Sequence, residues 1–503
     1  MQTKNIVFYI SLFIVAFLVS FGIYDPDDLY VISSYVHKNI IDHFGWGYLV
    51  SVFIFLVFSL WLAFSRYGKI KLGKDYEKPQ YSYFGWLSML FAAGMGIGLI
   101  FFGVAEPFSH YMNPPAYIQH ASGEAARFSM QYSFFHWGLH PWAIYIIMSL
   151  AIAYFCFRRD MPFLISSCFY PLIGPRIYGI TGYIIDILAV FATVFGIATS
   201  LGLGAMQINS GLSEAFGIPD TMQMTLLIIA TVTVLFMISS ISGLDRGIQI
   251  LSKTNIIVAI ILMLLMLVIG PTSYILNIFT STVGNYFSSL LDMSLNTHPF
   301  EGYRWTKEWT LFYWATWIAW SPFVGLFIAS ISRGRTIKEF ILVTLFVPTV
   351  LTFAWFSVFG GSALHLELFQ GVEIAGKAVE NVSTALFRVF EHYPLSMPLT
   401  ITAVVLLAVF FITSADSATY VLAMMTSRGD LNPPMSRKLL WGILQSATAS
   451  ILLLSGGVEA LKKMVIAAAL PFTIVMLFLC VAILRGLRYE VKYERDESPG
   501  EAQ

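Results

Sequence analysis

Long apolar runs recur along the whole chain, and they constrain its fold more than any other feature. Each is about 17 residues or longer, enough to cross a hydrocarbon core of about 30 Å as a helix. The runs are 6–23, 46–65, 84–112, 133–157, 182–206, 222–242, 255–270, 309–331, 339–361, 398–424, 438–455 and 464–484. Hydrophobic residues make up 57% of the chain and charged residues 12%, a balance typical of membrane proteins. We therefore expect an all-α integral membrane protein with twelve transmembrane helices.

The positions of Lys and Arg predict the orientation. With both termini in the cytoplasm, the termini and inner loops hold 21 of the 29 basic residues, as the positive-inside rule requires. The run at 6–23 is longer than a signal-peptide core and has no small-residue cleavage site before Asp25, so we interpret it as the first span. The net charge of zero gives no field that would attract nucleic acid.

The third predicted span is unusually rich in glycine. The stretch FAAGMGIGLIFFGVAEP, residues 91–107, carries Gly94, Gly96, Gly98 and Gly103. Such glycines serve close helix packing, or they let the backbone leave helical geometry and expose amides and carbonyls to a ligand. The alternate spacing favours the second interpretation, because transporters build sites at mid-membrane from interrupted helices.

The eighth predicted span offers a second interruption. Ser321, Pro322 and Gly325 lie in its middle. Paired interruptions are typical of inverted repeats, in which each repeat opens with a broken helix. The predicted organisation is two extra N-terminal helices (1–82), a first five-helix repeat (83–271), an interfacial amphipathic helix (272–300), a second five-helix repeat (301–484) and a short cytoplasmic tail (485–503).

Aromatic residues indicate what such a site would hold. They gather on one face of the fourth span and one face of the eighth: Trp137, Trp142, Tyr145, Trp317 and Trp320. Several rings without a carboxylate among them suit a quaternary ammonium, which binds ring faces at about 0.5 to 2 kcal/mol per contact. Amides freed at the glycine segment would receive a carboxylate, and the residues involved are Gly94, Met95, Gly96 and Gly98. A betaine carries both groups.

The tenth span carries oxygen ligands. Thr413, Ser414, Ser417 and Thr419 flank Asp416, and such hydroxyls suit a sodium ion. Two alternatives stay open. Serine and threonine in membrane helices often bond to their own backbone, and Asp416 is either a functional carboxylate or a structural acceptor near the helix end.

Three other classes of membrane protein are an enzyme, an ion channel, and an osmosensor or receptor. A membrane enzyme would need clustered acid, base or metal-ligand residues, and only His136 and His140 share a helix face, with no third ligand evident. We interpret them as packing or outer-gate residues and expect no enzymatic activity. A channel would be obstructed by the aromatic residues along the proposed path, whereas a membrane osmosensor or receptor stays open as an alternative.

Five stretches, in this order and over nearly the whole chain, resemble the betaine/carnitine/choline transporter family. They are GMGIGLIFFGVAEP, FHWGLHPWAIY, ATVFG at 192–196, WTLFYWATWIAWSPFVGLFIASISRGRTI and FFITSADSA. The resemblance implies a twelve-helix carrier with a LeuT-like five-plus-five inverted repeat. It also implies assembly as a homotrimer in membrane lipid and transport of compounds with a quaternary ammonium or similar onium group.

The resemblance further implies roles for individual residues. The aromatic residues Trp137, Trp142, Tyr145, Trp317 and Trp320 are similar to the substrate ligands of the glycine betaine carrier. The implied sodium site comprises the carbonyls of Ala92, Met95 and Phe410 and the hydroxyls of Thr413 and Ser414. A second sodium site would retain Thr193 and the ring of Phe323, with Ile197 in place of the family's threonine.

Four positions bear on the substrate and the coupling ion. At position 98 the glycine resembles the residue of sodium-coupled betaine carriers, whereas proton-coupled choline carriers of the family typically have aspartate there. The pair Thr413 and Ser414 is lacking in sodium-independent carnitine exchangers. Thr316 stands where the family has tryptophan, which removes one ring and favours a bulkier or more polar solute.

The predicted function is sodium-coupled symport of a zwitterionic onium solute, most simply glycine betaine, for osmoprotection or nutrient uptake. Sodium is the coupling ion, and no other cofactor is expected. The alternative within the family is a proton-coupled or exchange-type carrier of choline or carnitine. The expected location is a bacterial cytoplasmic (inner) membrane.

Overall fold

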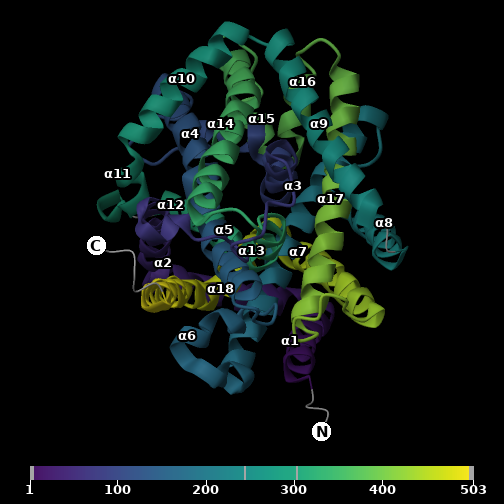
Figure 1. The fold of residues 1–503 in the computed structure, drawn as a ribbon. Helices are drawn as coiled ribbons and strands as arrows, with labels where there is room; N and C mark the ends of the chain where they lie inside the picture. The colour runs from purple at the N-terminus through teal and green to yellow at the C-terminus, as the bar shows by residue number, and fades with distance from the viewer. Residues whose placement is uncertain (1–4, 243–244, 302–303, 498–503) are drawn as a thin grey trace, which may run out of the picture.

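The computed structural model describes residues 5–242, 245–301 and 304–497, and for residues 91–95, 241–242, 245–252, 301 and 493–497 it describes the backbone alone. Within these ranges the chain is helical, apart from turns and one isolated antiparallel bridge between Lys71 and Thr336. Figure 1 shows long helices inclined to one another through the molecule. The all-helical architecture expected from the apolar runs is confirmed for the described part of the chain.

Local sequence signals determine where the first two helices end and begin. The opening helices are α1 (Ile6–Tyr24), α2 (Pro26–Phe64) and the short 3₁₀ helix η1 (Arg66–Lys69). Asp25 separates the first two: its Oδ1 accepts a hydrogen bond from the backbone N–H of Asp28 over 2.9 Å, and Pro26 occupies the first position of α2. A carboxylate cap followed by proline therefore begins α2.

Ten helices follow in the predicted first repeat. They are α3 (Tyr83–Met112), α4 (Gly123–Trp137), α5 (Leu139–Ile152), the π-helical η2 (Ala153–Arg158), η3 (Ser166–Phe169), α6 (Tyr170–Ile173), η4 (Gly174–Tyr178), α7 (Ile180–Phe216), α8 (Met222–Ser242) and α9 (Asp245–Ile269). The predicted fourth span bends at Gly138, which separates α4 from α5. A Cβ atom at Gly138 would lie 2.5 Å from the carbonyl oxygen of Phe134, so only glycine fits this junction.

The rest of the chain continues in the same way. Its helices are α10 (Thr272–Ser288), α11 (Leu290–Leu295), η5 (Pro299–Glu301), α12 (Arg304–Glu308), α13 (Thr310–Ile331), α14 (Ile337–Phe369), α15 (Ala375–Glu380), η6 (Val382–Thr384), α16 (Ala385–Phe390), α17 (Ser396–Met425) and α18 (Met435–Glu497). Helix α18 is two helices joined at a kink, where Gly456 and Gly457 leave helical geometry. Gly457 has φ of +59°, which L side chains rarely adopt.

Several helices have the length and composition of membrane spans. Among the described residues, nine helices qualify, or ten if the bent pair Lys253–Ile269 and Thr272–Ser288 counts as one span. That pair turns by 112°, so α10 lies across one end of the molecule (Figure 1). Large apolar side chains such as Phe13, Ile180 and Val268 cover the outside, where lipid would replace water. The count of twelve, the inverted repeat and the domain boundaries stay predictions.

Helix α3 differs from the expectation. It continues without interruption through Gly94, Gly96 and Gly98, so the interrupted backbone predicted there is not present. Gly96 and Gly98 instead admit bulky rings from other helices. A Cβ atom would lie 2.9 Å from Phe410 Cδ1 at Gly96 and 2.7 Å from Trp137 Cη2 at Gly98. Close helix packing, the alternative for these glycines, is what the structure contains.

Helix α13 is likewise continuous through Pro322. Proline lacks an N–H group, which leaves the carbonyl of Ile318 without its usual helical donor. The hydroxyl of Ser321 donates to that carbonyl over 2.8 Å, so the freed group is satisfied locally. Gly325 faces Met148, whose Cγ would lie 2.4 Å from an added Cβ. The second predicted interruption is therefore also absent. The carbonyl freed by Pro322 has a donor in Ser321, and Gly325 packs closely against Met148.

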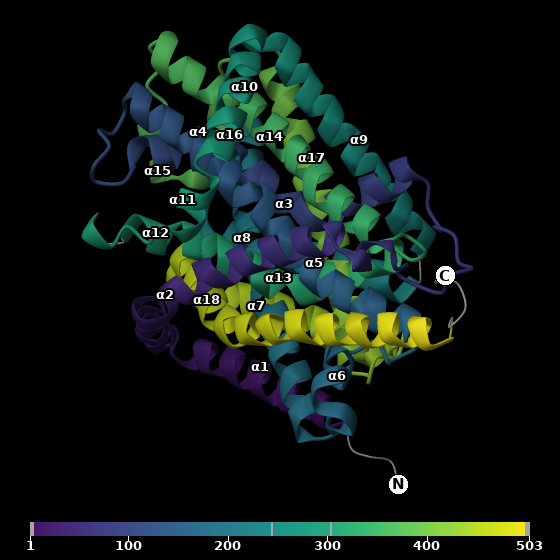
Figure 2. The same cartoon turned by 60° about the vertical axis from the view of Figure 1, so that its left-hand side comes forward.

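The centre of the molecule is built around two helices. Helix α7 packs against α17 and α18, and α13 packs against α5, α7 and α18. Figure 2 shows the C-terminal part of α18 running beside α2 across the molecule. Helices α3, α4, α7 and α13 thus approach one another from separate parts of the sequence, and their contact creates the site described next.

Two loops predicted to be cytoplasmic also meet. The indole N–H of Trp86 donates to the hydroxyl of Ser332 over 2.9 Å, and Arg333 Nε donates to Glu77 Oε2 over 2.8 Å. Gly334, the residue after Arg333, has φ of +83°, and an added Cβ at Gly334 would lie 2.6 Å from the backbone of Lys78. These contacts fasten the start of α3 to the end of α13.

Candidate functional site

A small cavity of about 30 Å³ lies where α3, α4, α7 and α13 meet. Six of its lining residues are aromatic, and the others are small, apolar or hydroxyl-bearing. The lining residues are Ile97, Gly98, Phe102, Trp137, Thr199, Ser200, Leu203, Phe312, Tyr313, Thr316, Trp317 and Trp320. This volume holds about one or two water molecules. The rings are therefore nearly in contact across the cavity.

Two glycines make room for the tryptophans. Gly98 on α3 lies against Trp137, and Gly196 on α7 lies against Trp320, whose Cδ1 would be 2.8 Å from an added Cβ. The indole N–H of Trp320 donates to the carbonyl of Gly196 over 2.7 Å. Gly196, the last residue of the ATVFG stretch, thus both contacts the indole of Trp320 and accepts its hydrogen bond.

The rings that line the cavity meet one another edge to face or stacked. Trp137 and Trp317 meet edge to face with centroids 4.9 Å apart, whereas Tyr313 and Trp317 stack at 6.1 Å. Phe102 meets Tyr313 edge to face at 5.4 Å. Ring faces carry negative electrostatic potential, so such a cluster is suited to a cation without strong hydrogen-bond donors.

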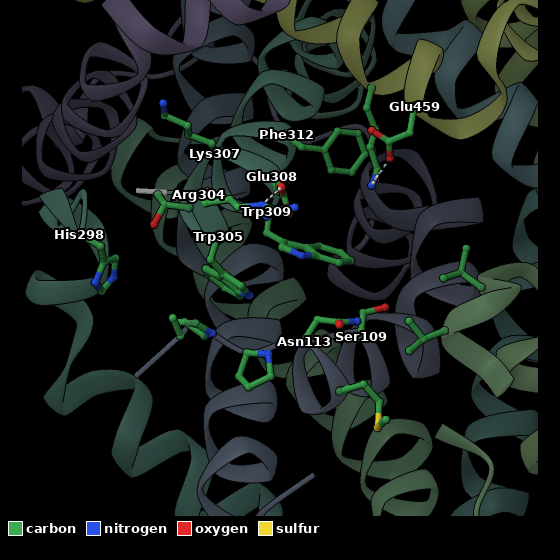
Figure 3. Close-up of a pocket in the computed structure, with 18 of the residues that line it drawn as sticks. Ser109, Asn113, His298, Arg304, Trp305, Lys307, Glu308, Trp309, Phe312 and Glu459 are labelled. Atoms are coloured by element: carbon green, nitrogen blue, oxygen red, sulfur yellow. Dashed lines mark hydrogen bonds and ion pairs between the residues drawn. The ribbon is translucent and has the colours of Figure 1, made fainter. Parts of the chain in front are cut away.

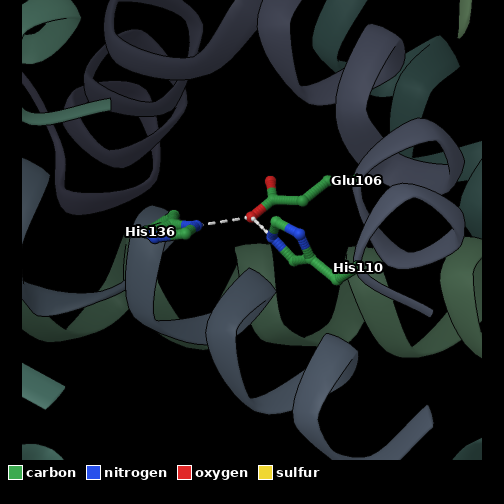
Figure 4. Close-up of side chains that lie close together, drawn as sticks. All are labelled: Glu106, His110 and His136. Carbon is green, nitrogen blue, oxygen red and sulfur yellow. Dashed lines mark hydrogen bonds and ion pairs between the residues drawn. The ribbon is translucent and has the colours of Figure 1, made fainter. Parts of the chain in front are cut away.

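A fully buried carboxylate anchors the polar edges of these rings. Glu106 Oε2 accepts hydrogen bonds from Trp137 Nε1 over 2.7 Å and from Tyr313 Oη over 2.6 Å. Its Oε1 lies 2.6 Å from His136 Nδ1 and 3.1 Å from His110 Nε2, as Figure 4 shows. Since an indole N–H can only donate, Oε2 acts as an acceptor, and Glu106 fixes the orientation of two cavity rings.

His136 extends this network to a third ring. Its Nε2 lies 3.0 Å from Thr310 Oγ1, and its backbone carbonyl accepts a hydrogen bond from Trp317 Nε1 over 3.0 Å. The orientations of Trp137, Tyr313 and Trp317 therefore all depend on Glu106 or His136. Buried polar groups that are satisfied in this way fix one arrangement of a core.

Comparisons with known proteins establish the family of the chain. A family model described as betaine/carnitine/choline family transporter matches residues 6–492. The chain belongs to this family. It is 51% identical to the glycine betaine transporter OpuD of Bacillus subtilis, over 96% of this chain and 94% of the relative.

Two further relatives extend the comparison. An ectoine/hydroxyectoine transporter of Virgibacillus pantothenticus is 44% identical, over 98% of this chain and 99% of the relative. Glycine betaine transporter 1 of Vibrio parahaemolyticus is 42% identical, over 97% of this chain and 94% of the relative. The chain is therefore a membrane transporter and not an enzyme, as the sequence predicted.

The predicted aromatic ligands occupy two layers of this transporter. Trp137, Trp317 and Trp320 line the cavity with Gly98 and Thr316, whereas Trp142 and Tyr145 do not. The ring of Tyr145 lies behind Trp317, with centroids 6.3 Å apart, and Trp142 lies 5.8 Å from Tyr145. Among the described residues, neither Trp142 Nε1 nor Tyr145 Oη has a hydrogen-bond partner, so both have unused donors close to the cavity.

The predicted sodium ligands belong to α3 and α17, two helices that pack against each other. The ring of Phe410 packs against Gly96, while Ala92, Gly94 and Met95 belong to the part of α3 of which only the backbone is described. Thr413 Oγ1 donates to the carbonyls of Val409 and Phe410 over 2.9 and 3.3 Å. Ser414 is next to it and partly buried.

The residues of the second predicted sodium site lie on α7 and α13. Thr193 Oγ1 donates to the carbonyl of Ala189 over 2.8 Å, and Phe323 meets Trp320 edge to face at 5.9 Å. Thr316 donates in the same way to Phe312 over 2.8 Å. The hydroxyls of Thr413, Thr193 and Thr316 thus bond to their own helices. For Thr413, this is the alternative that the sequence left open.

Glu106, His110 and His136 also place three potential metal-ligand atoms within 4.8 Å of one another. Their separations of 2.6 and 3.1 Å are those of hydrogen bonds, and the second carboxylate oxygen is taken by Trp137 and Tyr313. Structural zinc takes four ligands, and the described residues contribute three. We interpret the group as a hydrogen-bond network. His140 lies apart from it and contacts Ser294 Oγ at 2.9 Å.

Sequence reasoning missed half of the aromatic lining and the carboxylate behind it. Phe102 and Glu106 lie four and eight residues after Gly98, on the face of α3 that Gly98 marks. Phe312 and Tyr313 precede Thr316 and Trp317 by one helical turn. Helical spacing from the predicted residues would have found all four. Thr199, Ser200 and Leu203 gave no comparable signal.

Proposed function

We propose that this transporter is a sodium-coupled symporter of a zwitterionic solute that carries a quaternary ammonium group, with glycine betaine as the preferred solute. The observation that carries the proposal is the aromatic cavity at the meeting of α3, α4, α7 and α13. Its rings suit the onium group, and the relatives named glycine betaine transporters support this choice of solute.

Recognition of the cation rests on ring faces. Trp137, Tyr313, Trp317 and Trp320 surround one small space, and each face contributes about 0.5 to 2 kcal/mol to cation binding. The cavity of about 30 Å³ is smaller than the solute, so binding requires the rings to separate. Relative movement of α3 and α13 would supply this opening, as expected for a carrier that exposes its site alternately to each side.

Sodium would bind where α3 and α17 touch. The proposed ligands are the carbonyls of Ala92, Met95 and Phe410 and the hydroxyls of Thr413 and Ser414. In the sequence they are at most about one helical turn from Gly96 or Phe410, which touch each other. An ion at this contact would hold α17 against the helix that also lines the solute cavity. Ion and solute binding would then be coupled through α3.

The membrane potential would drive accumulation. Each sodium ion that moves inward gains about 2.3 kcal/mol per 100 mV, in addition to its concentration gradient. A betaine has no net charge, so the potential acts on the ion alone. We place the transporter in a bacterial cytoplasmic membrane, with both termini inside, as a homotrimer of five-plus-five inverted repeats.

Choline transport driven by protons is the alternative within the family. The position that carries aspartate in such carriers is Gly98 here, and even a Cβ atom at that position would approach Trp137 to 2.7 Å. An aspartate would displace the indole, so the geometry favours the betaine carrier. The ectoine transporter among the relatives and Thr316 in the lining favour a test of ectoine as a second solute.

Reconstituted liposomes test the proposal directly. Labelled glycine betaine uptake is measured with an inward sodium gradient and, in parallel, with potassium and a matched pH gradient. Accumulation only with sodium supports the proposed symport. Equal accumulation with the pH gradient overturns sodium coupling. If glycine betaine is not taken up but choline, carnitine or ectoine is, the choice of solute is overturned.

A further inference from the structure

The aromatic cavity offers ring faces for an onium group, but a carboxylate on the same solute needs a hydrogen-bond donor. The glycine spacing predicts that amides between Gly94 and Gly98 receive the carboxylate, whereas helix α3 is continuous there. Amides inside a continuous helix donate to carbonyls of that helix and have no hydrogen to offer a solute. The donors that remain are those of the side chains that line the cavity.

Nearly all of these side chains already donate a hydrogen bond within the protein. The lining residues with an N–H or O–H group are Trp137, Thr199, Ser200, Tyr313, Thr316, Trp317 and Trp320. The three indole N–H groups donate to one carboxylate and two backbone carbonyls. The two threonine hydroxyls donate to carbonyls one turn earlier in their own helices, and the Tyr313 hydroxyl donates to Glu106. Among the described residues, the Ser200 hydroxyl has no such acceptor, so it is the one donor of the lining that a solute can use.

The indole of Trp320 explains why the Ser200 hydroxyl has no acceptor. A serine or threonine hydroxyl in a helix can donate to the carbonyl four positions earlier, and Thr193 and Thr199 on α7 do so over 2.8 and 2.9 Å. For Ser200 that carbonyl belongs to Gly196, which accepts from Trp320 Nε1 over 2.7 Å. The same carbonyl accepts the backbone N–H of Ser200 in the continuous helix. Because a carbonyl oxygen has two lone pairs, Gly196 has no further capacity for the hydroxyl.

Ser200 and the indole of Trp320 lie near each other on the cavity wall. Both residues line the cavity, and Gly196, which accepts the hydrogen bond of the indole, precedes Ser200 by one helical turn, about 6 Å along α7. A betaine carries its onium group and its carboxylate on either side of one methylene group. A ring and a hydroxyl that are one turn apart suit that spacing.

Charged donors lie close by but outside the cavity. Figure 3 shows a larger pocket of about 1120 Å³, which shares the ring of Phe312 with the aromatic cavity. Lys307, Lys462 and Lys463 line that pocket and do not line the cavity. The ammonium of Lys462 lies 5.4 Å from the centroid of the shared ring. These lysines therefore do not replace Ser200 as a donor to a solute inside the cavity.

We propose that Ser200 is a specificity-determining residue, whose hydroxyl binds the carboxylate of the solute while the ring of Trp320 binds its onium group. A hydrogen bond from a hydroxyl to a carboxylate is charge-assisted and stronger than one to a neutral group. The hydroxyl therefore favours zwitterions with a carboxylate over onium compounds without one. This inference rests on the proposed function, since it concerns the polar group of the same solute.

Ser200→Ala tests this role in liposomes at saturating sodium. The KM for glycine betaine should rise about tenfold, because the hydrogen bond to the carboxylate is lost. Tetramethylammonium carries the onium group without a carboxylate, so the concentration at which it inhibits betaine uptake by half should not change. An unchanged KM for glycine betaine, or an equal loss of affinity for both compounds, would overturn the proposal.

Two further variants separate the lost donor from other effects of the substitution. Ser200→Cys retains a side chain of similar size, but a thiol is a weak donor, so its KM should rise as in Ser200→Ala. Ser213→Ala is the matched control, because Ser213 is a partly buried serine of the same helix that does not line the cavity. Its KM should equal that of the wild type. A normal KM for Ser200→Cys would assign the effect to volume and contradict the role of the hydroxyl.

The hydrogen bond of Trp320 provides an independent test. Trp320→Phe retains a ring but removes the N–H group, which leaves the carbonyl of Gly196 open to the Ser200 hydroxyl. In the Trp320→Phe background, Ser200→Ala should therefore raise the KM less than in the wild-type background, by about threefold. Equal factors in the two backgrounds would contradict the argument that the indole makes the hydroxyl available.

Uptake by the wild-type protein distinguishes this inference from the proposed function. If the wild type accumulates glycine betaine with sodium and Ser200→Ala has a normal KM, the role of Ser200 is overturned while the proposed function stands. If a pH gradient drives uptake instead, sodium coupling fails, but the KM ratio of the two proteins still decides the role of Ser200. If the wild type transports choline and no solute with a carboxylate, both are overturned.

Discussion

Glu106 and Trp137 are joined by a hydrogen bond of 2.7 Å between a carboxylate oxygen and an indole N–H, and both side chains are buried. This bond connects a charged residue that does not line the aromatic cavity to a ring that does. It makes the position of one ring that we propose binds the cation dependent on a carboxylate outside the cavity lining.

Replacing Glu106 by glutamine tests this dependence. The glutamine amide has one acceptor oxygen where the carboxylate has two, and its side chain has nearly the same volume. Either Trp137 and Tyr313 or His136 would therefore lose a hydrogen-bond acceptor. A buried donor left without a partner costs about 1 to 3 kcal/mol, so we expect the KM for glycine betaine to rise about tenfold or more. Initial uptake rates in liposomes give KM, and tryptophan fluorescence reports whether the rings have moved. An unchanged KM with unchanged fluorescence would contradict the role assigned to Glu106.

Trp317→Leu should abolish uptake at ordinary solute concentrations. The substitution removes a ring that faces Trp137 and Tyr313 across the cavity, so two ring pairs are lost together with the cation-binding face. Expression and detergent-solubilised size should remain normal. Trp46→Leu is the control, because Trp46 is 60% exposed on the surface of α2. Retention of normal affinity by Trp317→Leu would refute the aromatic site.

Gly98→Ala should weaken solute binding without unfolding the protein. The added methyl group would lie 2.7 Å from Trp137 and must push the indole aside. We expect a several-fold rise in KM, and a larger rise for Gly98→Asp. Gly47→Ala is a matched control on α2, since nothing lies within 4 Å of its added Cβ. Identical uptake by the two alanine variants would show that the contact with Trp137 has no functional weight.

Ser414→Ala should raise the sodium concentration needed for half-maximal uptake. One proposed oxygen ligand is lost, whereas the cavity residues are untouched, so the KM for solute at saturating sodium should change little. Thr402→Ala is the control on the same helix, because Thr402 is only partly buried and its hydroxyl donates to the carbonyl of Pro398 within α17. Sodium dependence equal to that of the wild type would exclude Ser414 from the ion site.

The ion pair of Glu77 and Arg333 should make the loop contact sensitive to acid. The hydrogen bond from Arg333 lowers the pKa of Glu77 below its ordinary value near 4.5. The ion pair therefore stabilises the folded protein at pH values above the ordinary pKa of glutamate. This stabilisation is lost as the pH falls through the lower pKa that Glu77 has in the folded protein. The Tm difference between wild type and Glu77→Gln should shrink as the pH is lowered from about 6 to about 4. A difference that stays constant with pH would contradict this pairing.

The sequence by itself determined the class of fold and the family. Apolar runs long enough to span a bilayer, the shortage of charge and the family motifs needed no tertiary information, because hydrophobicity and helix length are local properties. The same local signals identified Trp137, Trp317 and Trp320 as aromatic site residues. They were misleading at Gly94 to Gly98, where the spacing favoured an interrupted helix and the structure has a continuous one.

Only the tertiary structure decided what the glycines and the carboxylate do. Gly98 and Trp137 come from different helices, and Glu106 meets Tyr313 across 207 residues of sequence. Whether a glycine breaks a helix or admits a ring depends on which side chain another helix brings to it. Whether a buried carboxylate is tolerated depends on donors that arrive from elsewhere in the chain. Both are questions of packing between distant segments, which the spacing of residues along one helix does not encode.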